Sequence, residues 1–170
     1  LGNFRQEYIN LASGKILGGW IPYLAFYAFI IGGFVWFLYN KTRHGKYMYA
    51  IGGNENAAEV SGVNVNKTKI IIYTMAAALY GIAGFLLAAK SGGATVNYGQ
   101  GYELEAIAAC TIGGVSTNGG VVRVSGILIG VMVFELLKSS LQFLGVKTDY
   151  TYIVQGAVIV IAVALDIRKY

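Results

Sequence analysis

The chain has 170 residues, of which 56% are hydrophobic and 12% charged; its formal net charge is +5 and its mean hydropathy +0.58. A charged share about half that of a typical soluble domain cannot cover a water-facing surface, so lipid must solvate part of the chain. The 13 basic residues lie mainly in loops between apolar runs, which indicates the cytoplasmic face of a membrane protein and excludes a nucleic-acid partner.

The first apolar run, Ile16 to Asn40, carries no charge and is long enough for a helix through a bilayer core of about 30 Å. Pro22 near its start is compatible with a first helical turn. Aromatic residues gather toward the two ends of the run, as they do at membrane interfaces. They are Trp20, Tyr23, Tyr27, Trp36 and Tyr39.

A polar segment rich in small residues, Tyr47 to Val65, follows this span. It is poor at burying a core, and the small side chains of Ala57, Ala58 and Val60 give it a slim profile that could enter a groove on a partner. Basic residues flank it, so it is suited to a membrane surface. These are Lys41, Arg43, Lys46, Lys67 and Lys69. The alternative is an ordinary surface connector.

Capping signals predict a short helix inside this segment. Asn54 and Asn56 are both good N-caps, and Asn56 with Glu59 three residues later makes a capping-box-like pair. Gly62 is placed to end the helix in the left-handed conformation. We therefore expect a helix of about two turns, roughly Glu55 to Ser61, that lies across the membrane surface.

The second span is the uncharged run Ile70 to Ala89, whereas the third apolar stretch, Ala106 to Val122, is of a different kind. Its latter half reads GGVSTNGG, and each glycine in a helix costs about 1 kcal/mol relative to alanine. We expect a short helix from about Leu104 to Ile112 and irregular backbone after it. Because such backbone survives at membrane depth only where protein or a water-filled cavity covers it, this stretch is the best candidate for a translocation pathway.

The candidate pathway residues combine close backbone approach with small hydrogen-bonding side chains. They are Gly113, Gly114, Ser116, Thr117, Asn118, Gly119 and Gly120. The alternative is tight helix packing, which accounts for the glycines but less well for the three polar residues.

The fourth span is predicted from about Val124 to Leu141 and the fifth from Tyr150 to Leu165. Gly126 and Gly130 form a G-x-x-x-G pair in the fourth span, which favours close contact with another helix. With five crossings, placing the segment between the first two spans, Arg123 and the C-terminus in the cytoplasm satisfies the positive-inside rule. This puts 8 of the 13 basic residues inside: Lys41, Arg43, Lys46, Lys67, Lys69, Arg123, Arg168 and Lys169.

Four charged residues lie close to the predicted spans. Glu135 and Lys138 are three residues apart and can pair on one face of the fourth span, or snorkel. Glu103 and Glu105 lie at the start of the broken helix, where the helix dipole stabilises an acidic group by about 0.3–1 kcal/mol. Contact with a solute or its binding protein is the alternative for these two.

Enzyme chemistry has no basis in this sequence. The single cysteine, Cys110, excludes an internal disulfide, and the single histidine, His44, has no partner for a metal site. No Ser/His/Asp or Cys/His set and no G-x-x-x-x-G-K-[ST] motif occur, so we expect no catalytic residue, no metal and no cofactor in the chain. A stand-alone secondary transporter would need intramembrane ion-coupling charges, which the chain lacks. Because it starts at Leu1 and has few spans for a transporter, we interpret the chain as part of a longer protein.

Three segments carry a resemblance to a known family: YAIGGNENAAEVSGVNVNK, GYELEAIAACTIGGVSTNGG and GAVIVIAVALDIRKY. In this order and spacing, over about Lys46 to Tyr170, the chain resembles the C-terminal half of an ATP-binding-cassette (ABC) importer permease of the ribose/galactose type, which is related to branched-chain amino acid permeases. The AIAAC run, GGVS and the AVALD…KY ending are most similar to galactose/methyl-galactoside permeases.

This resemblance implies a multi-pass permease in the cytoplasmic (inner) membrane of a bacterium. Its partners would be a second permease copy or paralogue, an extracytoplasmic sugar-binding protein and a cytoplasmic ABC ATPase, which would bind the ATP and Mg. The segment Gly53 to Gly62 matches the family's GGN-x-x-AA-x-x-SG segment and would be the coupling helix that docks on the ATPase. The candidate docking residues are Gly53, Asn54, Ala57, Ala58, Ser61 and Gly62.

We therefore predict an all-α, polytopic membrane helical bundle with a broken third span and a short cytoplasmic coupling helix. Residues 1–170 would form a single transmembrane permease domain, the C-terminal portion of a longer chain, with residues 46–66 as its cytoplasmic coupling loop. The predicted function is translocation of a simple sugar, galactose or methyl-galactoside, or ribose. A permease for branched-chain amino acids or autoinducer-2, or a stand-alone secondary transporter, is the alternative.

Overall fold

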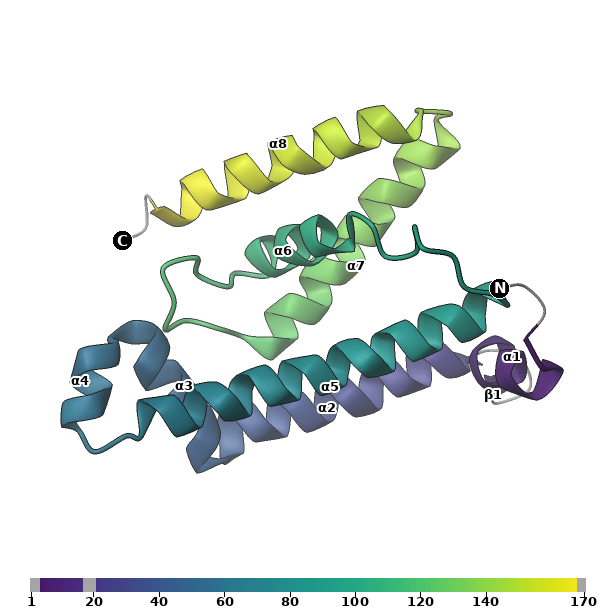
Figure 1. The fold of residues 1–170 in the computed structure, drawn as a ribbon. Coiled ribbons are helices and arrows are strands. Elements are labelled where there is room, and N and C mark those ends of the chain that lie inside the picture. The colour runs from purple at the N-terminus through teal and green to yellow at the C-terminus, as the bar shows by residue number, and fades with distance from the viewer. Residues whose placement is uncertain (1–3, 17–20, 168–170) are drawn as a thin grey trace.

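The computed structural model describes residues 4–16 and 21–167, and within these ranges it is almost entirely helical, as predicted. In chain order the elements are α1 (Gln6–Ser13), β1 (Lys15–Ile16), β2 (Ile21–Pro22), α2 (Tyr23–Lys41), α3 (Arg43–Gly53), α4 (Glu55–Val60), α5 (Val65–Ser91), α6 (Tyr102–Ile112), α7 (Val124–Phe143) and α8 (Thr148–Ile167) (Figure 1). The predicted interfacial residue Trp20 and the basic residues Arg168 and Lys169 lie outside the described residues.

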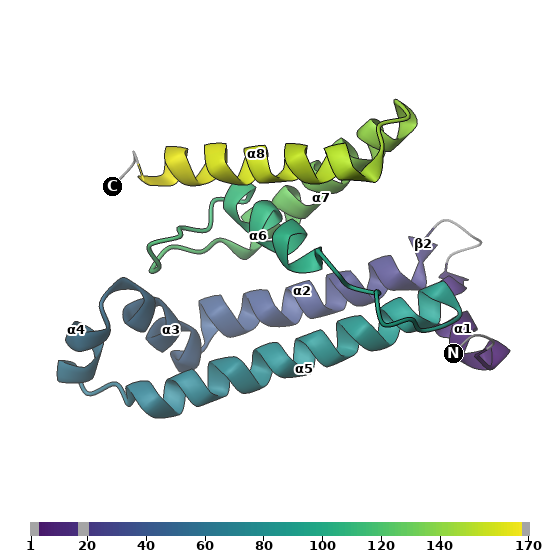
Figure 2. The same ribbon diagram turned by 45° about the horizontal axis from the view of Figure 1, so that its top comes forward.

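Three helices of the described chain, α2, α5 and α7, are long and apolar enough to cross a membrane. α2 and α5 run in opposite directions along the length of the molecule, and α7 is inclined to them (Figures 1 and 2). None of the most apolar part of α2 or α5 is buried within the chain. Such faces are expected where lipid or further protein covers them.

The molecule has two distinct ends. One, here called the α4 end, holds α3, α4 and the tip of the irregular segment 113–123, and the other, the α1 end, holds α1 and the two short strands (Figure 1). α5 and α7 run from the α4 end toward the α1 end, and α8 runs back. The polar segments at the two ends are thus separated by the apolar helices, as in a membrane protein.

The buried core lies where α6, α7 and α8 meet. Ala108, Ala109 and Phe134 are buried there, and Ile112 and Ile159 pack against them. Small residues on α6 allow the large Phe134 ring to fit at the helix contact, and alanine has no side-chain rotamer freedom to lose. The closest helix packing in the chain is therefore around the broken third span.

The glycine pair predicted for close helix contact is confirmed. An added Cβ at Gly126 or Gly130 would overlap backbone atoms of Gly113, and at Gly130 also the carbonyl oxygen of Ala109. α6 and α7 therefore approach each other through backbone at these three glycines, as G-x-x-x-G pairs allow.

The first span begins later than predicted. The helix starts at Tyr23, and the expected helical residues Ile16 and Ile21 belong instead to the antiparallel pair β1–β2, in which Ile16 faces Ile21 and Lys15 faces Pro22. Pro22 has extended backbone with ψ 144° and caps the helix from outside, because proline cannot supply a backbone N–H. The uncharged run does not mark this boundary because the strand residues are as apolar as the helix.

The remaining spans agree with the predicted centres but extend further. α5 is 27 residues long, about 40 Å, so it is longer than a bilayer core. The side-chain Oδ1 of Asn64 accepts a hydrogen bond from the Lys67 N–H at 3.0 Å and starts the helix, and Gly92, with φ +65°, ends it. The broken third span is confirmed: α6 ends at Ile112, and the chain up to Arg123 is irregular.

The helix α3 was missed by the sequence analysis, which placed a loop there. Thr42 caps it, with Oγ1 accepting from the Gly45 N–H at 3.2 Å and donating to the Leu38 carbonyl at 2.6 Å. Gly45 is buried against the backbone carbonyls of Leu38 and Tyr39, which leaves no room for a Cβ. The chain therefore turns sharply from α2 into α3, and only a glycine fits the corner.

Candidate functional site

The predicted surface helix is present as α4, capped at both ends. Asn54 Oδ1 accepts a hydrogen bond from the Ala57 N–H at 2.9 Å, which satisfies one of the free donors of the first turn. At the other end Gly62 has φ +86°, its N–H donates to the Glu59 carbonyl, and the Val63 N–H donates to Ala58. Gly62 therefore ends the helix in the left-handed conformation, as predicted.

The first of the two proposed N-caps is the one used. Asn56 lies inside α4, so the capping-box-like pair with Glu59 does not form at the helix start. Asn54 takes that place because its backbone is extended, with φ −159° and ψ 108°, as an N-cap requires. The sequence contains two asparagines that could cap the helix. Because α3 ends at Gly53 and α4 begins at Glu55, Asn54 is the one that lies at the N-cap position.

The two alanines of α4 face different ways. Ala57 is exposed and Val60 is 90% exposed, whereas Ala58 is only 4% exposed. The outward face of α4 is thus formed by Ala57 and Val60, and Ala58 contributes to holding the helix against the rest of the chain. The Ser61 hydroxyl donates a hydrogen bond to the Ala57 carbonyl at 2.7 Å, so it is bonded within the helix.

An ion pair ties α4 to the start of α5. Lys69 Nζ is 2.6 Å from Glu55 Oε1, and the two side chains are 41% and 50% exposed. Glu55 also lies in the first turn of α4, where an acidic group is favoured by the helix dipole. The pair orients α4 relative to the long apolar helix behind it.

The irregular segment 113–123 contacts α3 through glycines on both sides. An added Cβ at Gly119 would overlap the backbone of Gly52, and one at Gly120 would lie 3.0 Å from the Cα of Gly53. Gly119 and Gly120 have φ of +89° and +74°, conformations that favour glycine. We call this the glycine contact; it brings the predicted docking residue Gly53 next to two predicted pathway residues.

Tyr49 reinforces the same contact from the α3 side. Its hydroxyl donates to the Val122 carbonyl at 2.8 Å, and its ring packs edge-on against Tyr39 with the ring centroids 5.8 Å apart. One tyrosine therefore joins α2, α3 and the segment 113–123. No sequence motif predicted this role of Tyr49, since its partners Tyr39 and Val122 are 10 and 73 positions away in the chain.

The other predicted pathway residues separate into two groups. Gly113 belongs to the α6–α7 contact, so packing accounts for it, whereas Gly114 has φ +80° and open space where a Cβ would be. Ser116 is buried, and its Oγ accepts from the Asn118 N–H at 3.3 Å. Thr117 and Asn118 are exposed. The predicted pathway residues thus lie partly in the α6–α7 contact and partly in a turn near the α4 end, and their role in translocation stays a prediction.

A cluster of charged and polar side chains lies at the α1-end side of the core, between α6, α7 and α8. Lys138 Nζ is 2.6 Å from Glu105 Oε1, with side chains 24% and 16% exposed, and Gln155 Nε2 is 3.5 Å from the same oxygen. We call Glu105, Lys138 and Gln155 the polar cluster. The predicted pairing of Lys138 with Glu135 is wrong: Glu135 is exposed, and the partner comes from another helix.

Two cavities border the polar cluster. One of about 560 Å³ lies between α5, α6 and α7, and a smaller one of about 110 Å³ reaches α8. Both are lined by Tyr102, Glu105, Lys138 and Gln142. Sequence reasoning did not find this site because its residues come from three helices and match no motif. Glu105 on the first turn of α6 was the available signal.

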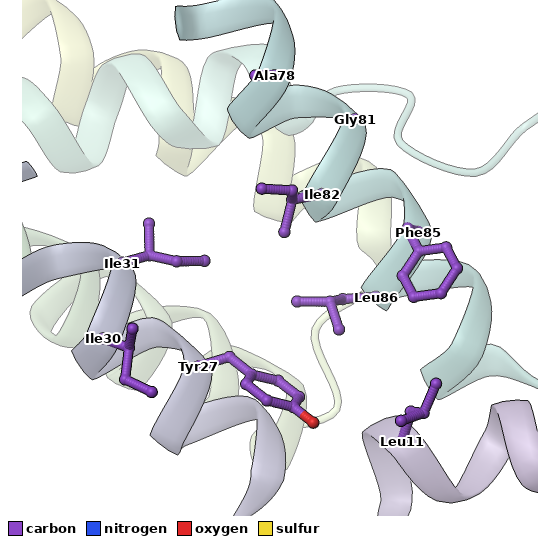
Figure 3. A pocket seen from close by; sticks show the side chains of 9 residues that line it. All are labelled: Leu11, Tyr27, Ile30, Ile31, Ala78, Gly81, Ile82, Phe85 and Leu86. Carbon is purple, nitrogen blue, oxygen red and sulfur yellow. The ribbon is translucent and has the colours of Figure 1, made fainter. Parts of the chain in front are cut away.

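A hollow of another character lies between α1, α2 and α5. It has a volume of about 510 Å³ and is lined by apolar side chains, with the Tyr27 hydroxyl as the one polar side-chain group (Figure 3). Ile31 of α2 and Ile82 and Leu86 of α5 project into the space between these two helices (Figure 3). Apart from the Tyr27 hydroxyl, such a surface offers a polar solute no side-chain hydrogen bonds, and it suits lipid or a further apolar chain. Among the described residues no group of three metal-ligating side chains occurs.

Comparison with known proteins identifies the family of the chain. Residues 2–163 match the family described as Branched-chain amino acid transport system / permease component. The chain is 47% identical over 167 residues to the galactose/methyl galactoside import permease protein MglC of Escherichia coli, covering 98% of this chain and 48% of that protein.

Two further relatives are named as permeases for other sugars. The ribose import permease protein RbsC of Escherichia coli is 43% identical over 150 residues, covering 88% of this chain and 45% of that protein. The xylose transport system permease protein XylH of Haemophilus influenzae is 47% identical over 130 residues, covering 76% of this chain and 35% of that protein. The chain thus spans about half the length of the curated relatives it matches. No solved structure matches it.

Proposed function

The chain belongs to the permease-component family of branched-chain amino acid transport systems, and we propose that it is part of the permease subunit of an ABC importer that carries a simple sugar across the cytoplasmic membrane. Galactose or a methyl galactoside is the first choice of cargo and ribose the second. The observation that carries the proposal is 47% identity over 98% of the chain to a galactose/methyl galactoside import permease.

The polar groups of the chain support a neutral cargo. The exposed Thr117 and Asn118 on the segment 113–123 are uncharged, and the charges of Lys138 and Glu105 neutralise each other. A sugar needs hydrogen-bond partners but no fixed counter-ion, whereas the zwitterion of an amino acid needs two. The apolar hollow between α2 and α5 offers no charged group and a single side-chain hydrogen-bond partner, the Tyr27 hydroxyl.

The partners follow from the two ends of the molecule. We assign the α4 end to the cytoplasm, because basic residues flank α3 and α4, and propose that the outward face of α4 docks on a separate ATPase that binds ATP and Mg. The α1 end would then face a sugar-binding protein on the outside. The unburied faces of α2 and α5 would meet lipid, the rest of the permease or a second permease copy.

Uptake of labelled sugar tests the cargo. Cells with the intact full-length gene take up galactose, ribose or both, and cells without it lose that uptake, while leucine uptake stays the same. Loss of leucine uptake with both sugars unaffected would overturn the assignment and favour the branched-chain amino acid alternative that the family's description suggests.

An arginine on α4 tests the docking face. Ala57→Arg adds a long charged side chain to the exposed face, so we expect the full-length permease to fold but to lose both sugar uptake and stimulation of the ATPase. Asn66→Arg is the matched control, because Asn66 is exposed at the same end but lies on α5. Normal transport by Ala57→Arg would refute the docking role. Ala58→Arg is unsuitable, since Ala58 is buried and the change would disturb folding.

A further inference from the structure

Gln155 on α8 has an amide oxygen that is left without a partner. The side chain is 1% exposed, its Nε2 lies 3.5 Å from Glu105 Oε1, and its Oε1 has no hydrogen-bond partner among the described residues. Turning the amide over would place its oxygen against the carboxylate, which is unfavourable because both are acceptors. A buried acceptor in this state destabilises the fold unless a group in the adjoining cavity pairs with it.

The same side chain lines a small cavity that adjoins one of the size that holds small molecules. Gln155 and Thr151 from α8 border the space of about 110 Å³, together with Glu105 and Lys138. Those two residues also line the neighbouring cavity of about 560 Å³, so the two spaces adjoin at the ion pair. Small-molecule sites in proteins usually have volumes of about 300–1,000 Å³ and a few convergent polar groups.

The chemistry of the lining selects the class of ligand. The Lys138 ammonium donates, the Glu105 carboxylate accepts, and the free Gln155 oxygen accepts, so hydroxyl groups that both donate and accept can be paired here. The ammonium and carboxylate compensate each other at 2.6 Å, and Lys90 and Glu135 on the wall of the larger cavity add one charge of each sign, so the lining as a whole carries no net charge. The Tyr102 ring, whose centroid is 5.7 Å from Lys138 Nζ, adds a flat surface beside the polar groups.

We propose that the two adjoining cavities bordered by α5, α6, α7 and α8 together hold a neutral polyhydroxyl solute on its way through the permease, with the Gln155 amide oxygen accepting a hydrogen bond from one of its hydroxyls. The inference rests on the proposed function and deepens it, because it names the residues that meet the cargo. They lie on α6, α7 and α8 near the α1 end, away from the glycine-rich segment 113–123 that the sequence indicated.

Replacing the amide by an isosteric apolar group tests this in the complete importer, in proteoliposomes with its ATPase and binding protein. Gln155→Met removes the unpaired oxygen, so we expect thermal stability equal to or above that of the wild type. Galactose uptake should fall about tenfold, the effect of losing one good hydrogen bond. Gln6→Met on α1, which lines none of these cavities, is the control and should change neither quantity.

Each alternative result has a distinct reading. If the wild type transports galactose and Gln155→Met transports it equally well, the cavity proposal is wrong and the sugar function stands. If Gln155→Met lowers stability and uptake together, the amide is structural and the proposal is also wrong. If the wild type transports neither galactose nor ribose, the proposed function itself fails.

Protection of a cysteine gives a direct readout of occupancy. In the full-length permease with Cys110→Ala, Gln142→Cys lies on the wall of both cavities, and Ser140→Cys is exposed on the same helix but lines neither. Galactose should slow labelling by a small thiol reagent several-fold at position 142 and leave position 140 unchanged. Equal slowing at both positions indicates a general closure and overturns the proposal. Absence of labelling at 142 without sugar, which means that other parts of the protein fill the space, overturns it too.

Discussion

The two ends of the molecule are held together in opposite ways. At the α4 end, the glycine contact joins α3 to the segment 113–123 mainly by backbone against backbone, with the Tyr49–Val122 hydrogen bond beside it. At the α1-end side of the core, the polar cluster joins α6, α7 and α8 through the tips of long side chains. One contact is thus fixed by volume and the other by charge and hydrogen bonding.

This difference suits two mechanical roles. Two backbones in contact cannot yield without separating, so a displacement of α4 is carried through α3 into the segment 113–123. Long side chains can change rotamer while keeping their charges paired, so the polar cluster can admit a solute without a backbone shift. The comparison therefore predicts that the α4 end is sensitive to added volume and the α1 end to lost charge.

The largest effect is expected from added volume at the glycine contact. Gly119→Val places a β-branched residue at φ +89° and drives its Cβ into the backbone of Gly52. Strain and overlap together cost about 2–6 kcal/mol, which the protein can relieve by separating the loop from α3. We expect sugar uptake by the full-length permease in vesicles to be abolished.

A glycine in an open position gives the control for this prediction. Gly33 on α2 has nothing within 4 Å of an added Cβ, and its φ is not positive, so Gly33→Val should retain transport. Equal loss in the two variants would show that glycine is needed for reasons other than the contact with α3. Equal tolerance would show that the contact carries no movement.

Lost charge at the polar cluster should have the next largest effect. Lys138→Met leaves Glu105 without its partner where the side chain is only 16% exposed, which we expect to cost about 1–3 kcal/mol of stability. Lys138→Met with Glu105→Gln removes both charges and should recover most of that loss. Thermal unfolding of the purified permease measures both values. A double variant less stable than the single one would mean that the cluster is held by more than its charges.

Much of the fold is readable from the sequence because its signals are local. The apolar runs located α2, α5, α7 and α8, and the GGVSTNGG run located the end of α6 at Ile112. The caps Asn54 and Gly62 likewise act within a few residues of the helix they bound. Such features need no knowledge of which helices become neighbours.

The sites depend on neighbours and were therefore only partly predictable. Gly119 and Gly120 were singled out as pathway residues, but the role that the structure gives them comes from Gly52 and Gly53, more than sixty positions away. Lys138 was assigned a partner three residues away on its own helix because a sequence shows only local pairs. The pairing with Glu105 follows from the α6–α7 contact, which the glycine pattern indicated without fixing which faces meet.

The smallest effect is expected at the exposed ion pair of α4, and it sharpens the comparison most. Lys69–Glu55 and Lys138–Glu105 have the same N–O distance, 2.6 Å, but the first pair has side chains 41% and 50% exposed and the second 24% and 16%. Glu55→Gln should therefore lower stability by less than about 1 kcal/mol, because water and salt screen an exposed pair.

High salt separates the two pairs further. It should erase the difference between Glu55→Gln and the wild type, while most of the loss in Lys138→Met should persist, because salt screens the less exposed pair less. Thermal unfolding of the wild type and the two variants in low and high salt gives the six values needed. If Glu55→Gln proves as costly as Lys138→Met, exposure does not decide the strength of these pairs, and α4 is held to α5 mainly by charge.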